Sequence, residues 1–253
     1  MLLFYASIFS HNYTGRRFIM STNQKRLVVL TGAGISAESG FKTFRDSGGL
    51  WETYSVEDVA SIQGWYRNPR LMTDFYNDLR SQLETAQPNE GHKILAELES
   101  YFDVQIITQN VDNLHEKAGS HNVLHLHGEL TKARPVNNEN KIIDIGYRKM
   151  QYDEKNEDGE ILRPHIVWFG EAVPEIMNAA KLVRSADIFA VVGSSLVVYP
   201  AAGLVHDLRS STRNFLIDPA EVEVPSWLKF RVIKEVASKG VAIMRDELLR
   251  DFV

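Results

Sequence analysis

Residues 27–51 decide the fold, and they read LVVLTGAGISAESGFKTFRDSGGLW. A short aliphatic run, residues 27–30, is followed by a Gly-x-Gly turn at Gly32 and Gly34 and then by small residues. This order is typical of the strand, the tight turn and the helix start of a dinucleotide-binding fold. Glycines at such a turn let the backbone approach a pyrophosphate, and the unpaired N–H groups of the helix start attract its charge. The stretch therefore predicts a nucleotide ligand.

The dinucleotide fingerprint is incomplete in this chain. It requires a third glycine at a fixed offset and an acidic residue about 20 positions further on. Gly40 comes too late for the third glycine, and residues 43–46, Thr-Phe-Arg-Asp, occupy the region where the acid is expected. Gly-x-Gly alone is weak evidence, so the rest of the chain has to support the nucleotide.

The composition is that of an ordinary soluble globular protein, with 44% hydrophobic and 24% charged residues among 253. This length fits one large α/β domain, or a domain with a modest insertion. A net charge of -5, with no run of lysine or arginine, argues against nucleic acid as a direct ligand. No apolar run reaches the roughly 18 residues of a membrane span, and no cysteine is present to form a disulfide or to bind a metal. We expect a cytoplasmic protein.

Residues 1–19 are expected to be an N-terminal extension, ahead of a single domain at 20–253. The apolar patch at residues 2–9 has no basic region before it and no small-residue cleavage site after it, so it makes a poor signal peptide. A natural start at Met20 explains the segment better.

Strand-like and helix-like segments alternate along the rest of the chain. The expected strands after residue 30 are 104–108, 123–126, 164–169, 187–193, 214–217 and 232–236, and the expected helices are 70–84, 92–100, 113–118, 174–185, one after Pro200 and one from about 241. The alternation predicts a Rossmann-like parallel sheet with right-handed crossovers as the large lobe of an α/β fold. Residues 131–163 are charged and the least core-like, and we expect them to form a smaller inserted lobe together with about 46–87.

Polar residues follow four of the expected strands, at 32–36, 109–112, 127–128 and 193–195. Taken singly, each cluster is explained as well by a turn or a helix cap, and capping statistics favour that explanation for Asp112 and Ser194. The carboxyl ends of parallel strands meet at one edge of the sheet, where ligands of this fold class bind. Four clusters at one edge predict a polar rim suited to a dinucleotide.

Five motifs stand in order along the chain: GAGISAESG at 32–40, continued by TFRD and GLW; TQNVDNLHEKAG at 108–119; HGEL at 127–130; VWFGE at 167–171; and GSSLVVYPA at 193–201. Together they resemble the signatures of the sirtuins, the NAD-dependent protein deacylases, and the resemblance covers nearly everything from residue 27 to residue 249. It implies NAD as the cofactor and an acyl-lysine protein or peptide as the partner. We expect a monomer.

The resemblance also implies which residues bind NAD. Gly32, Ala33 and Gly34 would hold the pyrophosphate, Thr43, Phe44 and Arg45 would lie on the loop that covers the cofactor, and Ser36 and Trp51 would contact it as well. The ribose and nicotinamide pocket would be lined by Gln109, Asn110 and Asp112. The adenosine half would be held by Gly193, Ser194, Ser195, Asp218 and Ala237, although the family more often has asparagine where Asp218 stands.

His127 would be the general base, and Asn110 would be a second catalytic residue. In the family, the acyl oxygen of the modified lysine displaces nicotinamide at the ribose, and a ribose hydroxyl then loses a proton to attack the adduct. Histidine suits this step because its ordinary pKa is about 6.5. The products are free lysine, nicotinamide and O-acyl-ADP-ribose.

A competing interpretation makes a metal site of His115, His121, His125 and His127, since alternate strand positions put the last two on one face. No pattern of carboxylates in the sequence supports it, and we expect no metal. A lone histidine is more often packed or exposed than catalytic, but the motif around His127 reverses that expectation.

The substrate peptide is expected to pair as an added strand between residues 167–171 and the segment after Ser195. The residues expected to contact it are Val167, Phe169, Gly170, Glu171 and Val198. Phe169 and Val198 would flank the lysine stem, or they would simply pack in the core.

The chain departs from the family in its small lobe. Most sirtuins hold a structural zinc there through two Cys-x-x-Cys pairs, and this chain has no cysteine. The resemblance therefore implies a zinc-free lobe, held by residues such as Ile142, Ile143, Ile145, Tyr147 and Ile161.

The acyl pocket departs from one subgroup, which removes succinyl and malonyl groups and has Tyr-x-x-Arg there. Here Tyr76 is present, Leu79 takes the arginine position and Arg80 follows. Residues three and four apart share a helix face, so Arg80 is a candidate for binding an acyl carboxylate, with Ala60 widening the pocket. The alternative is that Tyr76 packs and Arg80 is solvated.

Two other functions fit the same residues. Transfer of ADP-ribose to protein, or simple hydrolysis of NAD, would activate the same glycosidic bond, and a non-catalytic module would only bind NAD. His127 and Asn110 argue against the non-catalytic module. The motifs favour deacylation of lysine over both alternatives.

Overall fold

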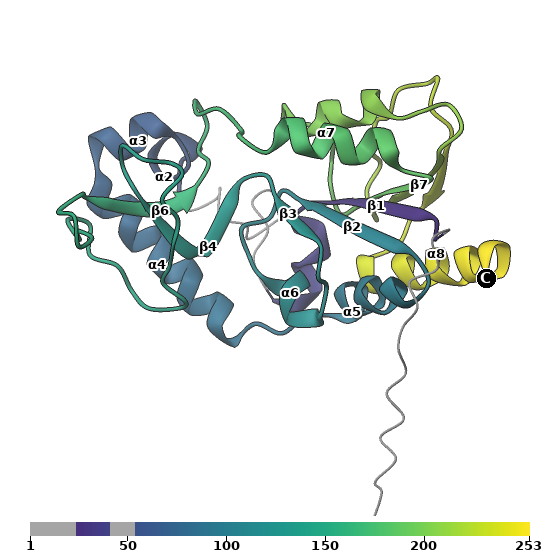
Figure 1. The fold of residues 1–253 in the computed structure, drawn as a ribbon, viewed down its shortest axis with the longest axis horizontal. Helices are drawn as coiled ribbons and strands as arrows, with labels where there is room; N and C mark the ends of the chain where they lie inside the picture. The colour runs from purple at the N-terminus through teal and green to yellow at the C-terminus, as the bar shows by residue number, and fades with distance from the viewer. Residues whose placement is uncertain (1–23, 41–53) are drawn as a thin grey trace, which may run out of the picture.

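The structure is a computed structural model of the chain that describes residues 24–40 and 54–253. Within these residues, the centre is a parallel sheet of six strands in the order β3-β2-β1-β7-β8-β9. Figure 1 labels four of them, β3, β2, β1 and β7. The strands are β1 (Arg26–Thr31), β2 (Asp103–Thr108), β3 (Val123–His125), β7 (Ile188–Val192), β8 (Arg213–Ile217) and β9 (Phe230–Ile233). β1 pairs with β2 on one side and β7 on the other, so the order of strands reverses at β1, where folds of this class bind ligands.

Side chains of β1 alternate between two apolar layers. Leu27 and Val29 pack with α5 (Glu90–Glu97) and α8 (Ala237–Phe252). Val28 and Leu30 pack with α7 (Ile176–Ser185) and the 3-10 helix η4 (Ala201–Asp207). In Figure 1, α7 lies on one side of the sheet and α5 and α8 on the other. Helices cover both faces, which is why residues 27–30 are apolar without alternation.

A second, antiparallel sheet in the order β5-β4-β6 belongs to a smaller lobe. Its strands are β4 (Gly128–Pro135), β5 (Ile143–Asp144) and β6 (Leu162–Ile166), and beside it pack α2 (Val56–Val59), α3 (Ile62–Arg67) and α4 (Pro69–Thr85) (Figure 1). The predicted fold class, a Rossmann-like sheet with a smaller inserted lobe, is confirmed. No helix among the described residues is long and apolar enough to cross a membrane.

Two expected helices have a different form. The turn after β1 leads into two 3-10 turns, η1 (Ala33–Ile35) and η2 (Ala37–Ser39), instead of an α-helix. Gly40 then ends them with a φ of 75°, a conformation that favours glycine and stops a right-handed helix. Pro200 is likewise followed by a 3-10 helix. Other elements differ at their ends, since β6 covers Leu162–Ile166 and α8 begins at Ala237.

Polar side chains of α4 join the small lobe together. Arg80 is fully buried, and it donates from Nε to the Leu130 carbonyl and from Nη1 to Asn77 Oδ1, both at 2.6 Å. Asn77 in turn donates from Nδ2 to the Met150 carbonyl and accepts from the Met150 N–H, both at 2.9 Å. These bonds connect α4 to β4 and to the segment around residue 150.

The apolar residues that we expected to hold the small lobe together do so only in part. Ile145 is buried, and Ile143 and Tyr147 pack against the apolar clusters beside it. Ile142 and Ile161 are 49% and 46% exposed, so the expectation is wrong for these two. Ile142 and Ile161 each precede a more buried residue in the chain. Because side chains alternate in direction along an extended backbone, these two isoleucines point outward.

Replacing Arg80 with methionine should lower the free energy of unfolding by about 2–4 kcal/mol, because the Leu130 carbonyl and Asn77 lose a buried donor. Arg67→Met is the control, since Arg67 is 53% exposed beside Glu57, and its loss should cost less than about 1 kcal/mol. Urea unfolding followed by circular dichroism measures both values. Equal losses in the two variants would contradict the role given to Arg80.

Candidate active site

A cavity of about 480 Å³ lies at the carboxyl ends of the parallel strands, between the large sheet and the small lobe. All four polar clusters that follow the strands contribute to its wall. The predicted residues that line it are Gly32, Ala33, Gly34, Ala60, Tyr76, Gln109, Asn110, His127, Val167, Phe169, Gly170, Glu171, Gly193, Ser194, Ser195, Val198, Asp218 and Ala237. Those that do not line it are Ser36, Asp112 and Arg80. Thr43, Phe44, Arg45 and Trp51 lie outside the described residues.

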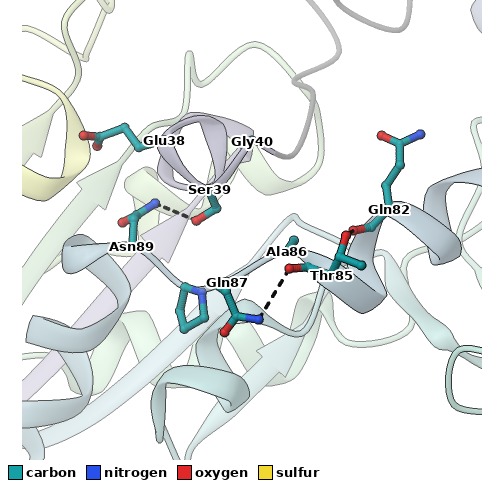
Figure 2. A pocket seen from close by; sticks show the side chains of 9 residues that line it. Glu38, Ser39, Gly40, Gln82, Thr85, Ala86, Gln87 and Asn89 are labelled. Carbon is teal, nitrogen blue, oxygen red and sulfur yellow. Dashed lines mark hydrogen bonds between the residues drawn. The ribbon is translucent and has the colours of Figure 1, made fainter.

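A second hollow, of about 560 Å³, lies beside η2 and the link between α4 and α5 (Figure 2). Asn89 donates there from Nδ2 to Ser39 Oγ at 3.0 Å. None of the predicted site residues that the structure describes lines this hollow, and Glu38 is the one charged residue in its described wall. The side chains that can carry chemistry therefore gather in the first cavity.

The loops after β1 and β7 touch backbone to backbone in the cavity wall. Gly34 N–H donates to the Gly193 carbonyl at 2.9 Å, and a Cβ on Gly34 would come within 2.7 Å of Gly193 Cα. Gly193 has a φ of 62°, which glycine adopts without strain. Gln109 ties a third strand end to these two, donating from Nε2 to Ser194 Oγ at 2.8 Å. The result is a wall of bare backbone that a pyrophosphate can approach.

Asn110 follows β2 and is held from behind the wall. Its Nδ2 donates to the Gly32 carbonyl and to Ser36 Oγ, both at 3.2 Å. Ser36 Oγ donates onward to Asp112 Oδ2 at 2.9 Å, and Asp112 Oδ1 accepts from the Leu114 N–H. Burial raises the pKa of Asp112, although these two hydrogen bonds oppose the shift. Ser36 and Asp112 thus support Asn110 and do not face the cavity, which corrects their expected place in its wall.

His127 lines the cavity, and the backbone of the neighbouring strand end orients its ring. Nδ1 lies 2.9 Å from the Gln109 carbonyl oxygen. A carbonyl oxygen only accepts, so Nδ1 carries the proton and Nε2 of the neutral ring keeps a lone pair. Burial lowers the pKa of His127, against the opposing effect of the bond to Gln109. Gly128, with a φ of 80°, sits where a Cβ would overlap the His165 carbonyl, and so allows this turn.

The four histidines of the alternative metal site do not come together. His115 is buried, with Nε2 3.1 Å from Thr31 Oγ1. His121 is instead 82% exposed, with Nδ1 2.6 Å from Glu99. Among the described residues, the four histidines therefore do not gather as ligands of one metal ion, and this interpretation is wrong.

Glu116, His125 and Glu129 do lie together, with potential ligand atoms within 4.8 Å of one another. His125 Nε2 is 2.8 Å from Glu116, and Glu129 pairs with Lys132 at 2.5 Å. Two carboxylates, one histidine and one lysine therefore satisfy each other. We assign no metal to this group.

Aromatic side chains of the small lobe close one end of the cavity. Trp168 Nε1 donates to Tyr76 Oη at 2.9 Å, and Trp65 stacks on Trp168 with ring centroids 5.3 Å apart. Burial raises the pKa of Tyr76, so its hydroxyl stays neutral. Arg163 lies 3.5 Å above the Trp168 ring and donates from both terminal nitrogens to Glu171. A carboxylate therefore compensates the charge of this cation.

Arg80 does not reach the pocket, so its expected role at an acyl carboxylate is wrong. Its guanidinium is bonded to Leu130 and Asn77 inside the small lobe. Burial lowers its pKa to about 10, so it is charged at neutral pH. A solvated Arg80, the alternative, is equally wrong. Tyr76 both packs in the core of the lobe and lines the cavity.

Reasoning from the sequence missed Trp168 and Glu116 beside this site, and it named His125 only as a ligand of the alternative metal site. Trp168 stands inside the VWFGE motif, and His125 stands two positions before His127 in a strand, so both had a signal. Glu116 stands inside the motif at 108–119, but its contact with His125 had no signal, because α6 (Leu114–Ala118) meets β3 only in the folded chain.

An NMR titration should separate the two neighbouring histidines. His127 should titrate below 6.5, because burial disfavours its charged form. Burial acts on His125 in the same way, but the hydrogen bond and the charge of Glu116 outweigh it and raise its pKa above 6.5. As the pH rises, His127 should therefore lose its proton first. Ring C–H shifts measure both, with His125→Gln and His127→Gln assigning the signals; the reverse order would contradict the effects given to burial at His127 and to Glu116 at His125.

Comparison with known proteins points to one family. The sequence model of the Sir2 family matches residues 32–200. The chain is 51% identical over 230 residues to an NAD-dependent protein deacylase of Bacteroides thetaiotaomicron, covering 89% of this chain and 98% of the relative. It is 50% identical over 195 residues to an NAD-dependent protein deacylase of Helicobacter pylori, covering 77% and 85%.

Solved structures are similar as well. A Sir2 homologue in complex with NAD has a TM-score of 0.81 at 35% identity and covers 91% of both chains. A Sir2 protein with a deacetylated peptide and 3'-O-acetyl-ADP-ribose has a TM-score of 0.77 at 30% identity, over 88% of this chain and 94% of that one. The family match over more than half of the chain, joined to these relatives, shows that the chain belongs to the Sir2 family, the sirtuins.

Proposed function

We propose that the cavity binds NAD beside an acyl-lysine of another protein and transfers a neutral acyl group from that lysine to the ADP-ribose part of NAD. NAD-dependent protein deacylation is the activity for which the relatives are named, and this member of their family is an NAD-dependent protein deacylase. What we add is the role of each residue and the acyl preference. The observation that carries the proposal is the oriented His127 beside Asn110 in one cavity at the switch point of the sheet.

The bare backbone at Gly34 and Gly193 supports a pyrophosphate site, since no side chain would stand between the peptide groups and the ligand. The two halves of NAD would then extend along the wall in opposite directions. The adenosine half would contact Ser194, Ser195, Asp218 and Ala237, and the nicotinamide ribose would contact Gln109 and Asn110.

His127 would act as the general base. Bound NAD would supply an electrophilic ribose carbon for the acyl oxygen, with nicotinamide as the leaving group, and a ribose hydroxyl would have to give up a proton. Nε2 of His127 has the lone pair for that proton, because Nδ1 is committed to the Gln109 carbonyl. The lowered pKa supports a neutral, proton-accepting ring at pH 7.

Transfer of ADP-ribose to protein and hydrolysis of NAD break the same bond. Neither reaction requires a pocket for an acyl group in addition to the residues that would bind the ribose. Here Tyr76 and Trp168 close such a pocket with aromatic surface, which supports an acyl group on a lysine as its occupant.

The charge of the wall supports a neutral acyl group. Among the described residues that line the cavity there is no lysine or arginine, and the carboxylates are Glu38, Glu171 and Asp218. Arg163, the cation at the aromatic end, is bound to Glu171 by both terminal nitrogens. A succinyl or malonyl carboxylate would lose its hydration without gaining a free cation from the described part of the wall, which is unfavourable.

The proposal includes three further expectations: a cytoplasmic location, a monomeric state and no nucleic-acid partner. The net charge of -5 supports the last one, because nucleic acid is repelled by a negatively charged protein.

Replacing His127 with alanine should lower the rate of deacylation by about 100- to 10,000-fold, the usual effect of losing a general base. The measurement is mass spectrometry of an acetyl-lysine peptide incubated with the full chain, with and without NAD. The control is His121→Ala, because His121 is 82% exposed and does not line the cavity. NAD consumption with an intact peptide in the unmodified protein would favour hydrolysis or ADP-ribose transfer instead.

Peptides of one sequence that carry acetyl, butyryl, malonyl or succinyl lysine should be deacylated at rates that depend on the charge of the acyl group. The two neutral groups should react at least about 10-fold faster in kcat/KM than the two acidic ones, the equivalent of about 1.4 kcal/mol. Faster removal of succinyl or malonyl would contradict the neutral pocket.

A further inference from the structure

Two histidines at the end of β3 bind two consecutive carbonyls of the strand end beside them. His127 Nδ1 is bonded to the Gln109 carbonyl, and His125 Nδ1 lies 3.1 Å from the Asn110 carbonyl. His125 differs in its second nitrogen, because Nε2 lies 2.8 Å from Glu116 Oε1. Both partners of His125 are acceptors, so both of its nitrogens donate and the ring carries a positive charge. The general base proposed above is neutral, whereas its neighbour is charged.

The His125 side chain is only 7% exposed, in contrast to ordinary surface ion pairs. Charged groups surround it on each side: Glu116 from α6, Glu129 and Lys132 from β4, and Asp112 from the turn after β2. The neutral ring of His127 follows two positions later. A buried, charge-assisted hydrogen bond from the His125 ring to the Asn110 carbonyl is stronger than one between neutral groups.

The bond from His125 completes the support of Asn110. The side chain of Asn110 is already held by Gly32 and Ser36. Among the hydrogen bonds of the described residues, the one from His125 is the only one that the Asn110 carbonyl oxygen accepts. Asn110 lines the cavity where the nicotinamide ribose is proposed to bind, so its position should affect the reaction of NAD more than the binding of the peptide.

We infer that His125, fixed by Glu116, is a positioning residue that holds Asn110 in place for the reaction of NAD. The inference rests on the proposed function and deepens it, because it names residues that act behind the wall of the same site. Neither His125 nor Glu116 lines the cavity.

The chain provides a matched control for this pair. His121 and Glu99 are also a histidine and a glutamate, with a distance of 2.6 Å between Nδ1 and Oε2. Their histidine is 82% exposed and neither residue lines the cavity. A change at His121 therefore removes a similar contact between histidine and glutamate without touching Asn110.

The test compares four variants of the full chain: His125→Leu, His125→Asn, Glu116→Gln and His121→Leu. Leucine removes both donors, whereas the amide of asparagine can take the place of Nδ1 and keep the bond to the Asn110 carbonyl. Deacylation of an acetyl-lysine peptide gives kcat and the KM values for NAD and for the peptide. Thermal unfolding of each variant, and its dissociation constant for NAD by calorimetry, are measured beside them.

His125→Leu should lower kcat/KM for NAD by about 10- to 100-fold, the effect expected for loss of one charge-assisted hydrogen bond. The KM for the peptide should stay unchanged. His125→Asn should recover most of the loss, Glu116→Gln should show a smaller loss, and His121→Leu should match the original protein. This pattern of rescue and of unequal KM values would not follow from a general loss of stability.

The inference is overturned if His125→Leu and His121→Leu have the same kcat/KM for NAD. It is also overturned if asparagine gives no rescue while both KM values and the melting temperature change together, because the pair would then be merely structural. If the unmodified protein removes no acyl group, the proposed function fails. In that case the dissociation constant for NAD decides the inference, since His125→Leu must weaken NAD binding and His121→Leu must not.

Discussion

The close approach of two backbones at Gly34 and Gly193 is the constraint on which the site depends. β1 and β7 are neighbouring parallel strands that end opposite each other, so the loops that follow them begin at the same edge of the sheet. A Cβ on Gly34 would stand within 2.7 Å of Gly193 Cα and would push the two loops apart. With glycine at both positions, the polar ends of three strands meet in one wall, and Gln109 locks the third strand to Ser194. The cavity exists because these strand ends can come so close.

The opposite wall depends on hydrogen bonds inside the small lobe. α4 turns Tyr76 toward the cavity while Asn77 and Arg80, on neighbouring positions of the same helix, hold β4 and the segment around residue 150. Arg163 and Glu171 fix Trp168 in a similar way. In a chain without cysteine, buried arginines that each donate to several acceptors provide connections between segments that are distant in sequence.

The two histidines at the end of β3 illustrate how surroundings divide one residue type into two states. The rings are two positions apart, and each donates from Nδ1 to a backbone carbonyl. The second nitrogen decides the difference: a carboxylate at His125 favours the charged ring, whereas burial without such a partner favours the neutral ring of His127. The lone pair that can accept a proton therefore belongs to His127, and the positive charge belongs to His125.

The sequence by itself determined the sheet, its strand-end clusters and the family. Periodicity and glycine turns are local properties, and parallel strands necessarily bring their carboxyl ends to one edge, so the residues of four separate motifs could be expected in one cavity. Most of the predicted residues that the structure describes line it.

Only the tertiary structure decided where the long polar side chains make their bonds. Arg80 bonds to Leu130, 50 positions away, instead of an acyl group, and Ser36 and Asp112 lie behind Asn110 instead of in the wall. The same holds for the pairing of His125 with Glu116 and for the 3-10 turns after β1. The physical reason is that a buried polar group goes to whichever partner the folded chain brings within hydrogen-bond distance, and the spacing of residues along a helix or strand does not contain that information.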